Sequence, residues 1–493
     1  MTCRPRRIAA LALLLGVAGC AGGGEGGAGA DRAGANPAQA KLIAEADAAM
    51  TRGALADAGR TLDAARSLDP ENPDLWLAIA RLRLRGGEHL TALEAADRAL
   101  ALGPDHGPAL LLRAMLVRDA HGAAAARHWF ERAAEADPDN PDIWAEYAAT
   151  LGDAGEAKAM LAAVRRLAAL APEDPRVFYL QAVLAARGGE DVLARSLLAK
   201  SGMAAKGVPA AMLLDAVISL RQGNAESAVA SLESLAARQP ANVRVRELLA
   251  HALLAGNHPD LVVTRFGADA TRAEASPYLV MLVARAQEQL GDRAAAAPLL
   301  ARANRALRDA PTVLAVREGL PEPTAAVRAA IQAGDRAGAR ARGAALRERF
   351  PASSDVASLA GDALLGAGDL AGALAAYARA SEARRPWPLA RKAAWAHARA
   401  GDAAAADLLL AEQVAGEPDT ASAVIALASR QAARGDWARA ALLLDHAVAL
   451  GAGHDPALLA LRVRAARTLG KGQEADRFAQ ILAEVQPRRL AAP

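Results

Sequence analysis

A proline recurs at a constant interval near the start of this chain, at Pro70, Pro104, Pro138 and Pro172. Each interval contains two apolar runs with helical spacing, a break between them, and the proline at its end. In the interval 73–104 the break falls at Gly86 and Gly87. Apolar residues at helical spacing, interrupted by glycine, predict two helices joined by a turn and repeated along the chain.

Small residues keep this phase even where the prolines fail. Alanine holds one position in eight successive units, at Ala46, Ala80, Ala114, Ala148, Ala182, Ala216, Ala250 and Ala284. Glycine ends the first helical run in six of these units, at Gly53, Gly87, Gly155, Gly189, Gly223 and Gly291, whereas His121 and Asn257 stand there in the other two. Small facing residues let two helices pack closely, and glycine readily adopts the left-handed conformation that ends a helix.

The spacing breaks once, after the eighth unit. Gly291 and Gly334 are farther apart than one interval of the series, and the stretch between them contains Pro311, Pro321 and Pro323. A second series of glycines follows, at Gly334, Gly368, Gly401, Gly435 and Gly470. The pattern predicts eight units over 39–310, a proline-rich joint over 311–323, five units over 324–489 and a tail over 490–493. Since prolines at this density disfavour a continuous helix, we expect the two blocks to change their relative angle at the joint.

The small and large positions together resemble the consensus of the tetratricopeptide repeat, whose period of about 34 residues equals the spacing of the prolines. The clearest unit spans 359–380, where key positions of the family hold Gly361, Gly368, Ala373, Tyr377 and Ala380. The resemblance implies an all-α fold, an α-solenoid that forms a right-handed superhelix of about 13 helix–turn–helix repeats. One family feature, a tyrosine at position 11, is missing in almost every unit.

The first residues have the arrangement of a secretory signal peptide over 1–19. Arg4, Arg6 and Arg7 precede an apolar run that is too short to cross a bilayer. Residues 17–20, Val-Ala-Gly-Cys, resemble a bacterial lipobox, which implies cleavage before Cys20 and lipid on its sulfur. Residues 20–38 are then the lipidated cysteine and a glycine-rich tether. The alternative is ordinary signal-peptidase cleavage nearby, which leaves Cys20 as a free thiol.

The lipobox resemblance sets the expected location. A lipidated Cys20 implies a protein anchored in the bacterial cell envelope and facing the periplasm. Ala21, rather than aspartate, follows the cysteine. In enteric-type sorting this is typical of an outer-membrane destination, although the sorting rule varies among bacteria.

Composition and motifs argue against several classes of function. The net charge is +3, and removal of the three signal arginines leaves +3 − 3, a neutral mature chain without the basic balance of a nucleic-acid-binding protein. Cys3 and Cys20 are the only cysteines. A glycine pattern at 366–371 matches a dinucleotide fingerprint, but it lies in a repeat turn rather than after a strand. We therefore predict no enzyme activity, no cofactor and no metal site.

The resemblance also implies a binding surface. In the tetratricopeptide family, the first helix of each unit lines a concave face. The corresponding positions hold arginines with interleaved aromatics: Arg81, Arg85, Arg118, Arg176, Tyr179, Arg187, Arg221, Tyr278, Arg285, Arg391, Trp395 and Arg399. Guanidinium groups bind carboxylates and phosphates through paired hydrogen bonds, so an arginine-rich trough suits an acidic partner. The alternative is that helix surfaces simply carry arginine in an arginine-rich chain.

Two functional hypotheses remain open at the level of sequence. The leading one is a membrane-anchored scaffold of the bacterial envelope, an accessory or assembly factor of a secretion or pilus machine that binds a protein or peptide. The alternative is a periplasmic component of exopolysaccharide export that binds an anionic polysaccharide directly.

Overall fold

The computed structural model describes residues 36–240, 242–272, 275–303, 322–453 and 455–485. Within these ranges the chain forms 26 α-helices, one π-helical turn and no strand. Successive helices pack in pairs, so the predicted all-α solenoid of about 13 repeats is confirmed. The expected signal peptide, the lipidated Cys20, nearly all of the tether, most of the proline-rich joint and the tail lie outside the described residues.

We name the first eight helix pairs the N-terminal arc and number the pairs in chain order. Its helices are α1 (Pro37–Thr51), α2 (Leu55–Leu68), α3 (Pro73–Arg85), α4 (His89–Leu102), α5 (Gly107–His121), α6 (Ala123–Ala136), α7 (Pro141–Asp153), α8 (Ala157–Leu170), α9 (Pro175–Gly188), α10 (Asp191–Ser201), α11 (Pro209–Arg221), α12 (Ala225–Arg238), α13 (Val243–Ala255), α14 (Pro259–Thr271), α15 (Pro277–Gln289) and α16 (Arg293–Ala303).

The remaining five pairs, 9 to 13, form the C-terminal arc. Its helices are α17 (Glu322–Gln332), α18 (Arg336–Arg349), α19 (Ser354–Gly366), α20 (Leu370–Ser381), α21 (Trp387–Arg399), α22 (Ala403–Gly416), α23 (Ala421–Ala433), α24 (Trp437–Ala447), α25 (Pro456–Thr468) and α26 (Gly472–Val485). The π-helical turn Val448–Ala452 follows α24.

Many first helices begin with the same local signal. The Asn72 side chain accepts a hydrogen bond from the Asp74 amide at 2.8 Å, and Pro73 occupies the first helical turn. The Asn140 side chain and Pro141 do the same at the start of α7. A polar cap satisfies an amide that has no partner in the helix, and proline has no amide to satisfy there. Pro73 and Pro141, each three residues after a proline of the regular series, therefore mark where these helices begin.

The turns inside the pairs depend on a left-handed residue, as the glycine series predicts. Gly87 has a φ of 76° and Gly368 a φ of 86°. In the seventh unit Asn257 takes this place with a φ of 61°, the one non-glycine residue with positive φ in the described chain. Pro259 stands in the first turn of α14, where proline is tolerated, so α13 and α14 both run for 13 residues.

The core is a row of local clusters built around the repeating alanines. All eight alanines of the series Ala46 to Ala284 are 0 % exposed. With only a methyl group there, neighbouring helices approach closely, and larger side chains such as Phe130 (0 % exposed) fill the space between successive pairs. Because every cluster joins only neighbouring pairs, stability along the chain is close to a sum of local contributions.

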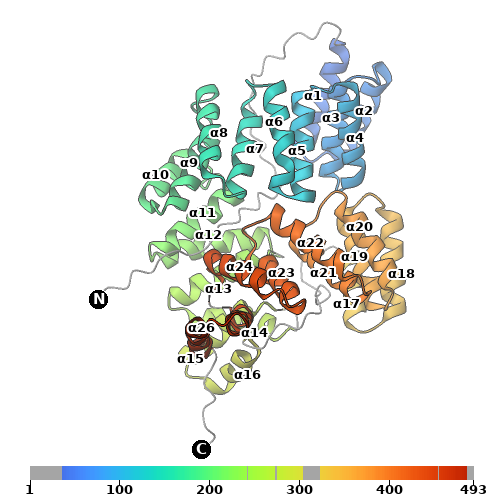
Figure 1. Cartoon of the computed structure of the whole chain (residues 1–493). Coiled ribbons are helices and arrows are strands. Elements are labelled where there is room, and N and C mark those ends of the chain that lie inside the picture. Colours follow the sequence, from blue (N-terminus) through green and yellow to red (C-terminus); the bar gives the residue numbers. More distant parts are fainter. Residues whose placement is uncertain (1–35, 241, 273–274, 304–321, 454, 486–493) are drawn as a thin grey trace, which may run out of the picture.

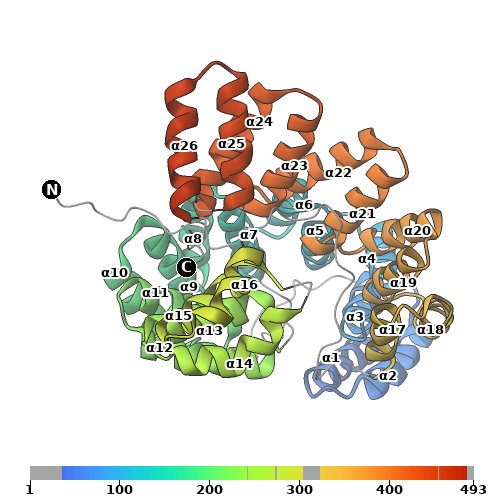
Figure 2. The same cartoon turned by 90° about the horizontal axis from the view of Figure 1, so that it is seen from below.

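The arcs wind around a common centre. Figure 2 shows α9, α11 and α13 on the inner side of the N-terminal arc, with α10, α12 and α14 outside them. Successive first helices also contact one another, as expected on the inner side of a curve. In both views the C-terminal arc returns to lie beside the N-terminal arc, with α19 to α22 alongside α3 to α6 (Figures 1 and 2).

Candidate functional site

The predicted arginines all lie on first helices of their pairs, but most of these side chains are already engaged within the chain. The Arg118 guanidinium lies 3.0 Å from the Glu146 carboxylate of the next pair. Arg176 reaches back 2.7 Å to Asp142, and Arg221 lies 2.9 Å from Asp191. These ion pairs connect successive helix pairs, so the same residues stabilise the stack and compensate its positive charge.

Other predicted arginines have acceptors in the preceding helix pair or on the same helix. Arg187 donates to the Gly152 carbonyl at the end of α7. Arg285 pairs with Glu288 on its own helix at 2.6 Å. Because a carbonyl oxygen or a carboxylate already occupies these two guanidinium groups, they offer little free positive charge to an anionic ligand. Arg391 of α21 is partly buried and also interacts within the chain. The inner face is therefore much less basic than its arginine content indicates.

Three predicted arginines are exposed and form no ion pair with a described residue: Arg81, Arg85 and Arg399. Arg81 and Arg85 both lie on α3 near Asp47 of α1. Burial raises the pKa of the Asp47 carboxyl, and the two guanidinium groups partly offset that rise. The two arginines on α3 thus form an exposed cationic patch, the α3 patch.

The aromatic residues of the predicted trough differ in their availability. Tyr179 is only 4 % exposed and packs in the core, and Trp395 is partly buried beside the core around Tyr377. Tyr278 is 37 % exposed, its ring stacks on His251, and its hydroxyl lies 3.1 Å from the histidine Nδ1. Of these three aromatics, only Tyr278 presents a substantial part of its surface to a partner.

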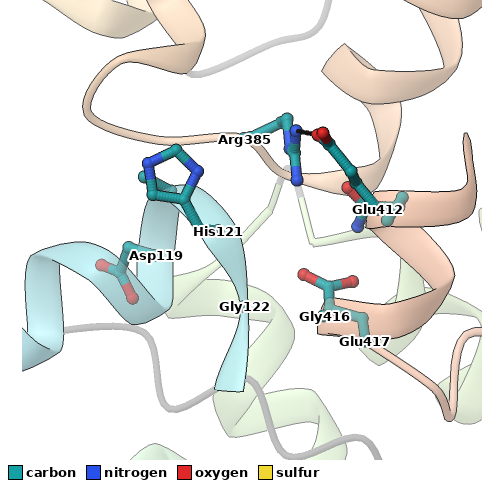
Figure 3. A pocket seen from close by; sticks show the side chains of 9 residues that line it. Asp119, His121, Gly122, Arg385, Glu412, Gly416 and Glu417 are labelled. Carbon is teal, nitrogen blue, oxygen red and sulfur yellow. Dashed lines mark hydrogen bonds and ion pairs between the residues drawn. The ribbon is translucent and has the colours of Figure 1, made fainter. Parts of the chain in front are cut away.

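A second surface, which the sequence analysis did not predict, lies where the two arcs meet. The turn between α5 and α6 contacts the end of α22 and the loop before α21 (Figure 3). The Arg385 amide donates to the Asp119 carbonyl at 3.0 Å, and the Arg385 guanidinium pairs with Glu412 at 2.7 Å. We call this meeting of turns and loops the inter-arc contact.

The electrostatics of the inter-arc contact are dominated by buried acids. Burial raises the pKa of Asp119, whereas Arg118 and Arg384 oppose the rise. Burial likewise raises the pKa of Glu417. It raises the pKa of Asp153 to about 7, against the opposing attraction of Arg118 and Arg187. Burial of a carboxylate disfavours its charged form, so these acids hold their protons more tightly than exposed acids do.

Two histidines at the contact respond in the opposite sense. Burial lowers the pKa of His89, and burial together with Arg385 lowers the pKa of His121. The cavity at the contact encloses about 10 Å³, which is room for one water molecule at most. The inter-arc contact is therefore a closed joint between two parts of the chain and has no space for a substrate.

A metal-binding cluster or a larger hollow would be a further candidate site among the described residues. No group of three or more histidine, cysteine, aspartate or glutamate side chains there is arranged to hold a metal ion. A larger hollow of about 290 Å³ lies between α2 and α3, where Gly59 leaves space and ion-paired Asp63, Arg66, Arg83 and Glu88 form part of its wall. Among the described helices, none is both long and apolar enough to span a bilayer.

One sequence signal was available for the inter-arc contact. His121 was an exception in the glycine series, and the left-handed glycine of that turn is Gly122, one residue later, with a φ of 87°. A Cβ on Gly122 would lie 2.4 Å from the Cα of Gly416 in the other arc. The displaced glycine thus marks a turn where two backbones touch.

The fold and these surfaces define an α-solenoid that offers extended faces for recognition rather than an enclosed site. A family model described as "Tetratricopeptide repeat" matches residues 43–107 and again 77–141. With 13 helix pairs of the same design, the chain is a tetratricopeptide repeat protein. Proteins with this fold are generally non-catalytic scaffolds that bind protein or peptide partners.

Solved structures with the same type of repeat include PilF and PilW. Pseudomonas aeruginosa PilF is 18 % identical, with 43 % of this chain and 97 % of that chain covered and a TM-score of 0.35. PilW, described as a widely conserved type IV pilus biogenesis factor, is 18 % identical, with 47 % and 91 % covered and a TM-score of 0.32.

A third structure, the human IFIT1 dimer with PPP-AAAA, is 17 % identical, with 69 % of this chain and 83 % of that chain covered and a TM-score of 0.41. Likeness at this level concerns the repeat fold alone. No curated protein matches the chain.

Proposed function

We propose that this chain is a scaffold of the bacterial envelope that binds a segment of a partner protein along its inner face, anchored by lipid on Cys20. The observation that carries the proposal is the row of first helices in the N-terminal arc, in which α1, α3, α5, α7, α9 and α11 contact one another in succession. Stacked repeats of this kind create extended concave surfaces. The Val-Ala-Gly-Cys sequence at 17–20 supports the anchor.

The charge distribution favours a protein partner over an anionic polysaccharide. Arg118, Arg176, Arg221 and Arg285 are paired with acids of the chain itself, so no continuous cationic track follows the inner face within the described residues. A protein segment, by contrast, needs only local complementarity, which the α3 patch around Arg81 and Arg85 and the exposed Tyr278 provide. Within the envelope, we assign the chain to a secretion or pilus machine as an accessory factor.

Affinity purification of the full-length protein from its own membranes tests this proposal. Recovery of secretion or pilus proteins with the native chain, and their loss with Arg81→Ala/Arg85→Ala, is the expected result. The matched control is Arg98→Ala/Arg165→Ala, which removes the same charge from exposed positions on α4 and α8, the second helices of their pairs. Recovery of polysaccharide-export proteins instead, or equal loss in the control variant, would overturn it.

A further inference from the structure

The inter-arc contact repeats in register over two neighbouring helix pairs. At pair 2 the Leu90 amide donates to the Ala352 carbonyl at 3.1 Å, and the Ser354 amide donates to the His89 Nδ1 at 3.3 Å. At pair 3 the Arg385 amide donates to the Asp119 carbonyl. In each case a turn inside an N-terminal pair meets a loop between two C-terminal pairs. The contact is thus an edge-to-edge stacking of one superhelical turn on the next.

Charges lie beside this register at the next pairs. Asp419, in the loop between α22 and α23, is attracted by Arg187 of α9 and repels the Asp153 carboxyl at the end of α7. The hydrogen bonds place loops 350–353 and 382–386 against pairs 2 and 3 in order, which sets the superhelical turn at between seven and eight pairs.

No hydrophobic cluster of buried residues among the described residues spans both arcs: each belongs to one arc, from the cluster around Ala46 to the one around Leu458. Few of the buried apolar residues that the structure describes lie at the contact, Leu90, Ala120 and Ala123 on one side and Ala383 on the other. Hydrogen bonds join the two arcs beside them. Polar interfaces of this kind between separately cored units permit relative motion.

The closest approach in the contact is backbone on backbone. The three atoms nearest to a Cβ on Gly416 would be the His121 carbonyl oxygen at 2.7 Å, the Gly122 Cα at 3.2 Å and the His121 carbonyl carbon at 3.4 Å. All three belong to the opposite arc. A side chain at position 416 therefore separates the arcs, while the end of α22 keeps its place within its own arc.

We propose that the inter-arc contact is a reversible clasp, at which the two arcs open and close as separate bodies to control access to the inner face. The clasp rests on the proposed function in one respect only, that the inner face to which it controls access is where the partner binds. When closed, the clasp seals the wall between successive superhelical turns at pairs 2 and 3, so a partner segment enters along the superhelix axis. When open, it admits a folded partner from the side.

Amide hydrogen exchange tests the clasp in the full-length protein without any partner. The amides of Leu90, Ser354 and Arg385 all find their acceptors in the opposite arc. They lie at a helix start or in a loop, where an amide has no intrahelical acceptor. In the native chain we expect these three amides to be protected, with protection weaker than that of amides inside α5, α19 or α21.

The wedge variant is Gly416→Leu, with Gly416→Ala as a smaller wedge. Gly188→Leu is the matched control, since Gly188 also ends a helix and a Cβ there meets nothing within 4 Å. In Gly416→Leu the three amides should exchange at least tenfold faster, with helix amides of both arcs unchanged, and the control should match the native chain.

Three results would overturn the clasp. One is exchange of the three amides in the native chain at the rate of unprotected amides, which means that the contact does not form. Another is unchanged protection in both wedge variants. The third is loss of amide protection throughout α21 and α22 in both wedge variants. That result would mean that the C-terminal arc needs the contact in order to fold, so the arcs could not open as separate bodies. Failure of the purification experiment leaves all of these readings intact, so the two proposals are tested separately.

Discussion

Replacement of Lys392 by methionine should destabilise one segment of the solenoid and leave the rest intact. Lys392 of α21 is 4 % exposed and Asp362 of α19 is 0 % exposed. The lysine Nζ lies 2.7 Å from the Asp362 Oδ1, and the Tyr377 hydroxyl donates to the same oxygen at 2.8 Å. Lys392→Met leaves a buried carboxylate with only one neutral donor, at a cost of about 3–5 kcal/mol.

The loss should be confined to pairs 10 and 11, because each pair packs mainly on its neighbours. The amides of α19 to α22 that exchange through local opening should exchange about a hundredfold to a few thousandfold faster. This range is the loss of stability converted to a rate ratio, since each step of about 1.4 kcal/mol of free energy is a factor of ten. Amides of α7 to α12 should not change. Unfolding monitored for the whole chain is less informative, because long repeat arrays do not unfold in two states.

The triple variant Asp362→Leu/Lys392→Met/Tyr377→Phe is the control for this reasoning. It removes the buried charges together with the hydroxyl that serves them, and such replacements by apolar residues are often close to neutral. A small effect of Lys392→Met, below about 1 kcal/mol, would refute the argument from buried charge. So would a triple variant as unstable as the single one.

Three further predictions concern separate parts of the chain. Gly59→Ala should stabilise pairs 1 and 2 by about 0.5–1 kcal/mol, because alanine favours the helical backbone of α2 more than glycine does. The added Cβ has room, since it would lie 3.7 Å from Leu82 Cδ2, an ordinary contact distance. Slower amide exchange in α2 is the expected result, and faster exchange would contradict it. Arg118, Arg187, Glu146 and Asp419 face Asp153, and the structure around it should lose stability as pH rises from about 4 to about 7 and then level off, because only the folded carboxyl keeps its proton in this range. Asp153→Asn should remove this step from a pH series of local opening free energies, measured by amide exchange in α7 and corrected for the intrinsic exchange rate. An unchanged step would exclude Asp153 as its source. Cys20→Ser should move the protein from the membrane fraction to the soluble fraction, and retention in the membrane would rule out the lipid anchor.

Local features of this fold could be predicted because their causes are local. The regularly spaced alanines and the glycines of the turns act within one helix pair, so their burial and their left-handed backbone follow from the repeat itself. The expected separation of the chain into two series of units also depended on local spacing, through the prolines between Gly291 and Gly334.

The charge state of the inner face was harder to predict, although the sequence contains the necessary residues. Arg118 pairs with Glu146 of the following helix pair, and Arg176 pairs with Asp142 of the preceding one. Each acid lies about one unit away, where the curvature of the stack brings it beside the arginine. The positive charge of the inner face was overestimated because the arginines were counted without the acids of the neighbouring units.

The inter-arc contact depends on geometry that accumulates over many repeats. Ser354 and His89 are 265 residues apart, and they meet because small rotations between successive pairs add up to a closed turn. A change of a few degrees in the rotation between successive pairs would move these two residues apart or make them clash. No residue-level pattern specifies such a sum, although the displaced glycine at position 122 indicates an unusual turn.

The distance between the two arcs in solution tests the closed superhelix most directly. The distance can be measured by double electron–electron resonance between two spin labels, attached to cysteines introduced at exposed Glu94 of α4 and Arg347 of α18. The full-length chain is used, with Cys3 and Cys20 replaced by serine. A closed superhelix predicts one narrow distribution of label–label distances. When Gly416→Leu is added, the mean distance should increase and the distribution should broaden. A distribution that is already broad without the wedge, or one that the wedge does not change, would contradict it.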